Sequence, residues 1–132
     1  DALNILKQYM NIIFVSGDKR GFDISKKRVE DMGYKIYPVS TFERSDWIKK
    51  EGYNLDETIY MGDGIFDPLV FEKVKYSIAP NDAFIHTRDK ADFITKSDAG
   101  KGAVAEAVVH ILNKFLNISK IVPNDKEGLW QK

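Results

Sequence analysis

The sequence predicts an α/β protein with a Rossmann-like, doubly wound and mostly parallel sheet. Short apolar runs, each ending in small or polar residues, alternate with amphipathic segments across most of the 132 residues. This alternation is typical of βαβ units, whose right-handed crossovers place helices on both faces of a parallel sheet. The length suits one domain with a sizeable core, and the sequence contains no internal repeat or low-complexity segment.

Local patterns predict each element of the first half. Apolar residues at helical spacing, such as Leu3, Leu6 and Met10, indicate helices. A continuous apolar run such as 11–18 predicts a strand that is buried on both faces. Gly33 and Gly52 are typical helix ends. In order, we expect a helix over 1–10 capped by Asp1, a strand over 11–18, a helix over 22–33, a strand over 34–39, a helix over 40–53 with Phe42, Trp47 and Ile48 as its apolar residues, and a strand over 57–63.

The second half continues the alternation and ends in the clearest amphipathic helix. Pro68 fits the first turn of a short helix. We expect a helix over 67–74, a strand over 76–80, a helical turn over 82–89, a strand over 91–96 and a helix over 100–116 whose apolar stripe is Val104, Val108, Ile111, Leu112 and Phe115. One domain would therefore cover 1–116. Residues 117–132 would form an extended tail, docked through Ile121, Val122 and Trp130.

The composition argues against several classes of function. Twenty basic and twenty acidic residues cancel, so no overall field attracts nucleic acid or an anionic membrane. The absence of cysteine excludes disulfides and thiolate-bound zinc. No apolar run is long enough to span a membrane and no signal-peptide pattern opens the chain, so we expect a cytoplasmic protein.

Polar residues follow the first four predicted strands, at the strand ends where doubly wound sheets bind their ligands. Asp63 and Asp67 offer hard carboxylate oxygens, which suit Mg²⁺, whereas zinc would favour His or Cys. Ser16 and the amides around Gly17 lie near a helix start and suit a phosphate. The residues after the four strands are Ser16, Gly17 and Asp18; Ser40, Thr41 and Arg44; Asp63, Gly64 and Asp67; Asn81 and Asp82. Together they predict magnesium-assisted phosphate chemistry, although each short motif alone also fits a turn or a cap.

Three stretches in this order resemble the haloacid dehalogenase superfamily of phosphatases. The closest likeness is to its small capless branch, typified by 3-deoxy-manno-octulosonate 8-phosphate phosphatases. "IIFVSGD" resembles the second motif of the family, a strand that ends in Ser or Thr. "YMGDGIFDPLVFEKV" resembles the fourth motif, Gly-Asp followed by a second Asp four residues on. "YSIAPNDAFIHTRDKADFITKSDAGKGAVAEAVVHIL" resembles the downstream part of the branch, so the likeness covers roughly 10–115.

The resemblance implies a role for each matching residue. Ser16 would hydrogen-bond the transferred phosphoryl group, and Gly17 and Asp18 would shape the phosphate loop. Asp63 would ligate Mg²⁺, and Asp67 would support the ion or one of its waters. Lys101 would face the substrate or a neighbouring subunit, because capless members usually assemble as tetramers. The substrate would be a small phosphorylated metabolite, such as a sugar-acid phosphate.

Two family motifs have no direct match. The first, Asp-x-Asp-Gly, supplies the aspartate nucleophile on a central strand between those ending in Ser16 and Asp63, and this sequence is absent before Ile12. We therefore expect the natural protein to extend further N-terminally, because omitting that strand would leave two strand edges unpaired. The third motif is a basic residue. Ser40 is its closest positional match and cannot supply a cation, so Arg44, one helical turn later, is the candidate.

Two main hypotheses and one weaker one follow. The first is a Mg²⁺-dependent phosphomonoesterase whose nucleophile lies outside the 132 residues, so that this chain alone would be inactive. The second is a degenerate, non-catalytic module for binding, oligomerisation or regulation. A nucleotide-binding domain is the weakest alternative, because no glycine-rich phosphate loop follows the first strand.

Overall fold

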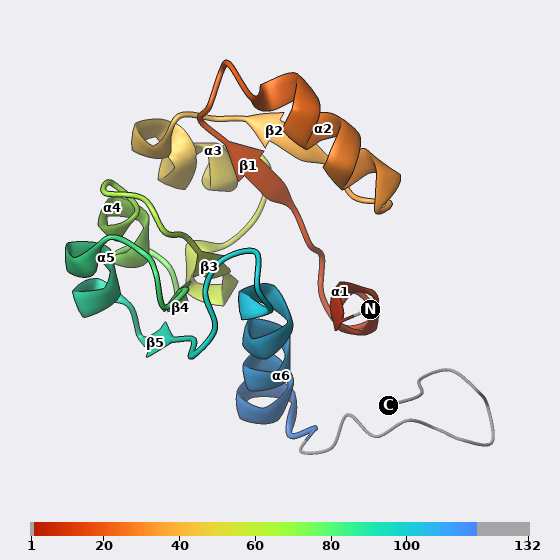
Figure 1. Ribbon diagram of the computed structural model, residues 1–132, viewed down its shortest axis with the longest axis vertical. Helices are drawn as coiled ribbons and strands as arrows, with labels where there is room; N and C mark the ends of the chain where they lie inside the picture. Colours follow the sequence, from red (N-terminus) through yellow and green to blue (C-terminus); the bar gives the residue numbers. More distant parts are fainter. Residues whose placement is uncertain (1, 119–132) are drawn as a thin grey trace.

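The computed structural model describes residues 2–118. Figure 1 shows parallel strands interleaved with helices, so the predicted α/β class and element order are confirmed. The elements are α1 (Ala2–Leu6), β1 (Phe14–Ser16), α2 (Phe22–Asp31), β2 (Ile36–Pro38), the 3₁₀ helix η1 (Thr41–Glu43), α3 (Arg44–Lys50), the 3₁₀ helix η2 (Leu55–Glu57), β3 (Ile59–Met61), α4 (Pro68–Phe71), β4 (Tyr76–Ala79), α5 (Ile85–Lys90), β5 (Phe93–Ile94) and α6 (Ala103–Leu116).

The strands form two parallel sheets rather than one. In the first, Phe14 of β1 lies opposite Ile36 of β2 and Ser16 lies opposite Pro38. The second has the order β3-β4-β5, with Tyr60 opposite Ser77. Among the described residues, no strand pairs with the remaining edges of β1 and β3. These two edges line a common cavity of about 590 Å³.

The open edge explains a difference from the sequence prediction. The run 11–18 was expected to be a strand buried on both faces, yet all three residues of β1 are only half-buried. Val15 and Ile13 line the cavity between β1 and β3. Such apolar residues are typical of a strand in the middle of a sheet. Within the described residues, however, β1 pairs with a neighbour on one edge only, that of β2.

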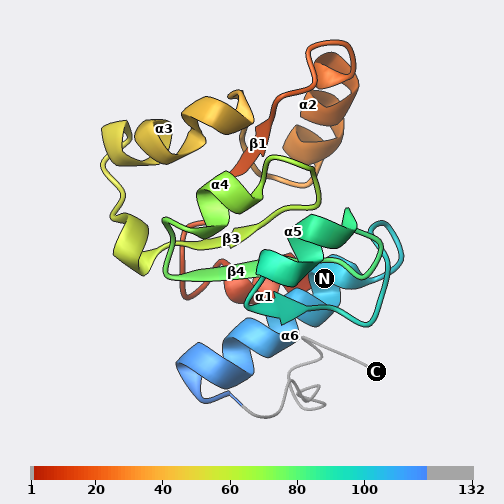
Figure 2. The same ribbon diagram turned by 90° about the vertical axis from the view of Figure 1, so that its left-hand side faces the viewer.

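The three-stranded sheet has helices on both faces, as Figure 2 shows for α4 and α6. Alternate residues of β4 point to opposite faces. Ile78 packs in the cluster built by α6, and Ala79 packs in a cluster with Val70 and Phe71 of α4. α1 packs against α6 and contributes Leu6 to the first cluster.

The predicted stripe of α6 is wrong at one position. Val104 is 44% exposed, whereas Ala103 and Ala107 are buried with Val108, Ile111 and Leu112. Val104 instead lines the cavity between β1 and β3.

The N-terminal helix is also shorter than predicted. α1 ends at Leu6, and Tyr9 and Met10 form a turn that leads the chain towards β1. Met10 still packs partly against the α6 cluster. The predictions for Asp1 and for a docked tail through Ile121, Val122 and Trp130 lie outside the described residues.

Candidate active site

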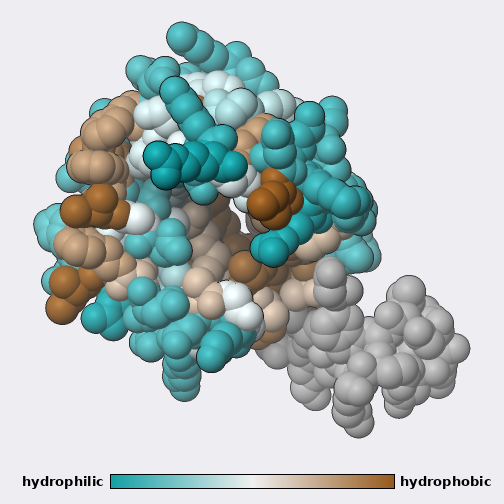
Figure 3. Space-filling view, turned by 45° about the horizontal axis from the view of Figure 1, so that its top comes forward, coloured by the Kyte–Doolittle hydropathy of each residue, from teal (hydrophilic) through white to brown (hydrophobic). Residues whose placement is uncertain are grey.

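Residues that follow the carboxyl ends of β1 and β3 line part of the cavity between these strands. Six of the seven predicted site residues line it: Ser16, Gly17, Asp18, Arg44, Asp63 and Asp67. Figure 3 shows the surface hollowed in the middle of this face, with apolar residues in its depth. Lys101 is not among the lining residues, although its neighbours Ala99 and Gly100 are. It lies in an exposed turn just before α6.

The loop after β1 is shaped by two polar side chains. Ser16 Oγ accepts a hydrogen bond from the amide of Asp18 (3.2 Å). Asp18 Oδ1 in turn accepts from the amides of Arg20 (3.0 Å) and Gly21 (3.1 Å), which leads the chain into α2. Such local bonds are typical of Asp in turns. Gly17 lies between them, where a Cβ would come within 3.3 Å of Arg44 Nη2.

The loop after β3 holds Asp63 by its backbone and leaves the carboxylate free. The carbonyl of Asp63 accepts from the amide of Phe84 (3.2 Å), and the carbonyl of Gly64 accepts from Thr87 Oγ1 (2.6 Å). Within residues 2–118, the exposed carboxylate of Asp63 makes no hydrogen bond or ion pair. A loop held by two backbone hydrogen bonds therefore presents an unpaired acidic group to the cavity.

Asp67 points into the protein instead of into solvent. Its side chain is 7% exposed and accepts three hydrogen bonds: from Tyr60 Oη (2.6 Å), the Gly64 amide (2.8 Å) and Arg44 Nη1 (3.3 Å). A Cβ at Gly62 would clash with this carboxylate, so the Gly-Asp motif needs its glycine here. Asp67 thus supports the loop that carries Asp63, and both of its oxygens are occupied.

Arg44 is the buried cation of the site. Its Nε donates to the carbonyl of Val39 (3.0 Å) and its Nη1 donates to Tyr60 Oη (2.7 Å). Burial, followed by the charge of Asp67, raises the pKa of Tyr60, so this hydroxyl stays protonated and can donate to Asp67. Ser40 only caps η1, where its Oγ accepts from the amide of Phe42 (3.3 Å).

Sequence reasoning did not include Tyr60 or Thr87 in the site. Both are buried, and both reach it through a hydroxyl. The one feature that could have pointed to them is the hydroxyl of each side chain. A hydroxyl that is buried among apolar residues needs a hydrogen-bond partner. Which partner it finds depends on how α3, α4 and α5 pack.

The donor set supplies part of a metal site. Among residues 2–118, no group of three or more His, Cys, Asp and Glu side chains is arranged to hold a metal ion. Mg²⁺ commonly takes one or two carboxylates together with waters and phosphate oxygens. The free carboxylate of Asp63 fits that pattern as one ligand.

None of the helices within residues 2–118 is long and apolar enough to cross a membrane.

Comparison with known proteins identifies the family. Residues 44–108 match the haloacid dehalogenase-like hydrolase family. The chain therefore carries a haloacid dehalogenase-like hydrolase domain. It is 30% identical over 91 residues to the 3-deoxy-D-manno-octulosonate 8-phosphate phosphatase of Haemophilus influenzae, covering 66% of this chain and 51% of that protein. It is also 30% identical over 127 residues to a phosphoglycolate phosphatase of Staphylothermus marinus, covering 86% of this chain and 51% of that one.

A solved structure agrees with this assignment. The 3-deoxy-D-manno-octulosonate 8-phosphate phosphatase of Moraxella catarrhalis, in complex with magnesium, phosphate and KDO, superposes with a TM-score of 0.72. The sequence identity is 25%, and the match covers 85% of this chain and 66% of that chain. The present chain spans about half the length of the curated relatives that it matches.

Proposed function

We propose that this domain is part of a Mg²⁺-dependent phosphomonoesterase that acts on a small sugar-acid phosphate or a similar metabolite. The observation that carries the proposal is one cavity lined by a strand-end serine, a buried arginine and an unpaired aspartate, Ser16, Arg44 and Asp63. A hydroxyl and a guanidinium bind phosphate oxygens, and a carboxylate binds the accompanying cation.

In this proposal the chain orients the phosphate from two sides. Ser16 Oγ and the amide of Gly17 donate to phosphate oxygens, and Arg44 adds positive charge beside the loop. Asp63 is the metal ligand from this chain. Asp67 acts indirectly, because its two oxygens hold Gly64, Tyr60 and Arg44. A bound Mg²⁺ would neutralise phosphate charge at this rim.

We further propose that a strand from another part of the natural protein fills the cavity between β1 and β3. The resemblance to the family supports this, since its nucleophile lies on such a strand. The free edges of both strands support it as well, because unpaired backbone groups beside an apolar groove are costly. The added strand would bring the aspartate nucleophile to the rim that carries Ser16 and Asp63.

Hydrolysis by the natural full-length gene product tests the proposal. The relatives act on different phosphomonoesters, so the panel should include 3-deoxy-D-manno-octulosonate 8-phosphate and phosphoglycolate. We expect Mg²⁺-dependent release of phosphate, its loss in Asp63→Asn, and no loss in Asp31→Asn, an exposed carboxylate at the far end of α2. Full activity of Asp63→Asn would refute the assignment of Asp63 as a metal ligand. Turnover by the 132-residue chain alone would refute the claim that the nucleophile lies outside these residues.

The alternative is a non-catalytic module used for binding, oligomerisation or regulation. It is favoured by the lack of a three-ligand acidic or histidine cluster within residues 2–118. The sequence immediately upstream of Asp1 separates the two: Asp-x-Asp-Gly there supports the enzyme, and its absence supports the module.

The assembly and the location are proposals of the same kind. By resemblance to capless members, the protein would be a cytoplasmic homotetramer, with exposed Lys101 near the substrate or a neighbouring subunit. Sedimentation of the full-length protein tests the assembly. If the protein is a monomer, Lys101 cannot contact a neighbouring subunit.

A further inference from the structure

The hydroxyl of Tyr60 lies between a buried cation and a buried carboxylate. It accepts a hydrogen bond from Arg44 Nη1 at 2.7 Å and donates one to Asp67 Oδ1 at 2.6 Å. A phenolic hydroxyl has one proton to donate and lone pairs to accept with, so it satisfies both partners at once. Tyr60 is 8% exposed and lies on β3, two residues before the Gly-Asp motif.

The direct contact between Arg44 and Asp67 is the weaker connection. Their N–O distance of 3.3 Å is longer than the roughly 2.7–2.9 Å of a strong charge-assisted hydrogen bond. Both bonds through the Tyr60 hydroxyl are shorter than that contact. Tyr60 is therefore the main link between the guanidinium and the carboxylate.

Fixing two nitrogens of Arg44 fixes the third. The guanidinium is planar and rigid, so its orientation is set once Nε is bonded to Val39 and Nη1 to Tyr60. Nη2 then lies against Gly17, 3.3 Å from where a Cβ would stand, and makes no hydrogen bond within residues 2–118. Arg44 and Gly17 both line the cavity. The free donors of Nη2 are thus aimed at the Ser16–Asp18 loop.

We propose that Tyr60 is a positioning residue for phosphate binding. Its hydroxyl holds the Arg44 guanidinium so that Nη2 faces the loop where phosphate would bind, and it touches neither substrate nor phosphate itself. This inference rests on the proposed phosphatase function and adds a residue to it. The polar triad of Tyr60, Arg44 and Asp67 then connects the phosphate loop after β1 with the carboxylate loop after β3.

The kinetic test uses Tyr60→Phe in the natural full-length protein. Losing the link frees Arg44 to turn away, so we expect KM and the Ki of inorganic phosphate to rise about tenfold, comparable to one hydrogen bond to a charged group. Tyr76→Phe is the matched control. It removes a phenolic hydroxyl from the neighbouring strand β4, where that hydroxyl is hydrogen-bonded to His110. This change should leave KM and Ki unchanged.

A double-mutant cycle separates positioning from a general loss of structure. Lysine at position 44 has one nitrogen and cannot bond Val39, Tyr60 and the cavity together. Tyr60→Phe should therefore add little to the Ki change caused by Arg44→Lys, because it acts through Arg44. Fully additive effects on Ki would overturn the proposal.

A second measurement on the natural full-length protein needs no catalysis. In ¹⁵N NMR, the Arg44 Nη1 and Nη2 signals should be separate in the wild type and should shift when inorganic phosphate is added. They should merge in Tyr60→Phe as the guanidinium begins to rotate. Should Tyr60→Phe fail to fold, an unchanged wild-type Nη2 signal at saturating phosphate still overturns the proposal.

The outcomes for the two proposals are distinct. A full-length protein that hydrolyses no phosphomonoester overturns the proposed function. An active protein in which Tyr60→Phe leaves KM and Ki unchanged overturns only the role of Tyr60.

Discussion

Thr87 Oγ1 donates a 2.6 Å hydrogen bond to the carbonyl oxygen of Gly64 and thereby ties α5 to the loop that carries Asp63. Thr87 is fully buried. The amide of Phe84, just before α5, binds the preceding carbonyl, that of Asp63. The exposed carboxylate of Asp63 is thus presented by a backbone that is held from below by the next βα unit.

Thr87→Val should destabilise the protein while keeping the size of the side chain. Valine removes the donor and leaves the Gly64 carbonyl without it, so we expect a loss of about 1–3 kcal/mol in the free energy of unfolding. Urea denaturation measures this loss. Thr58→Val is the control, because the Thr58 hydroxyl binds the Asn54 carbonyl near the surface, where water can replace it. Equal losses in the two variants would contradict a special role for Thr87.

The position of the candidate site could be predicted from the sequence because parallel strands end at one edge. Ser16 and Asp63 follow separate strands, and the sheet brings both to the same cavity. Arg44 could be selected by its type and its place one turn into a helix. Its partners could not, since the meeting of Arg44, Tyr60 and Asp67 depends on how α3 and α4 pack.

The apolar pattern of α6 shows a second limit. A helix offers neighbouring stripes that differ by about one position in sequence, and the period alone does not choose between them. The stripe with Val104 is more hydrophobic, but the structure buries Ala103 and Ala107 in its place. Val104 faces the cavity between β1 and β3 instead, and only the tertiary structure contains that information.

Leu112→Ala should be among the most damaging substitutions on α6. Leu112 is fully buried in the cluster with Ile78 and Leu6, so alanine leaves a cavity and costs about 2–5 kcal/mol. Val109→Ala removes apolar atoms from the same helix on its exposed side and should cost much less. Thermal and urea unfolding of both variants check this. Similar costs would mean that α6 packs on a different face.

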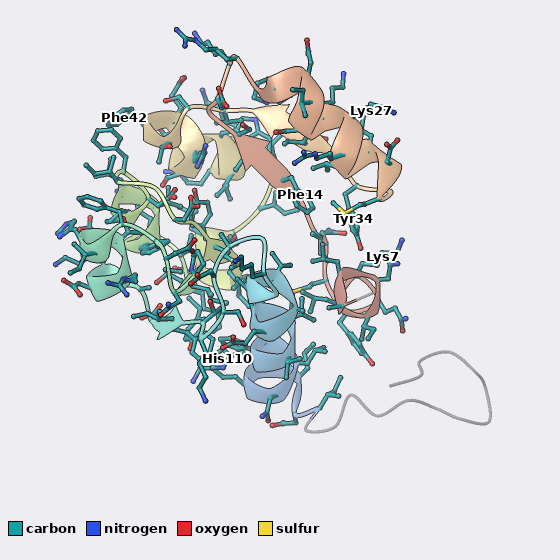
Figure 4. The ribbon with its side chains drawn as sticks, viewed as in Figure 1. Lys7, Phe14, Lys27, Tyr34, Phe42 and His110 are labelled. Atoms are coloured by element: carbon teal, nitrogen blue, oxygen red, sulfur yellow. The ribbon has the colours of Figure 1, made fainter. Side chains whose placement is uncertain are left out.

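His110 should make stability fall as the pH is lowered. It stacks on Phe93 with ring centroids 3.6 Å apart and binds Tyr76 Oη at 2.7 Å; Figure 4 shows it on α6. Burial, aided by the charge of Lys114, lowers the pKa of His110 below its usual 6.5. Below about pH 6.5 the unfolded chain therefore binds the proton more readily, and stability declines until the folded-state pKa is passed.

Paired glutamine variants test this prediction. His110→Gln should flatten the decline in unfolding free energy between about pH 7 and pH 5. His86→Gln should keep the decline, because His86 is exposed on α5. A slope that persists in His110→Gln would assign the pH dependence to other groups.

Glu106 should also contribute stability that is present at neutral pH and lost in acid. From α6 its carboxylate accepts the amides of Lys96 (2.8 Å) and Ser97 (3.0 Å), which closes the loop after β5. The bond from the Lys96 amide is the main cause that lowers the pKa of Glu106 from 4.5. A lowered carboxyl pKa means that the stabilisation is complete above about pH 4.5 and disappears as the pH falls through the folded-state value.

Glu106→Gln should therefore be less stable than the wild type at neutral pH, with the two curves converging in acid. Glutamine keeps an acceptor oxygen but loses the charge that strengthens both amide bonds. Urea unfolding at a series of pH values measures the difference, and Glu30→Gln, an exposed change on α2, is the control that should show no such convergence. A gap between wild type and Glu106→Gln that stays constant down to about pH 3 would show that the loop depends on the shape of Glu106 and not on its charge.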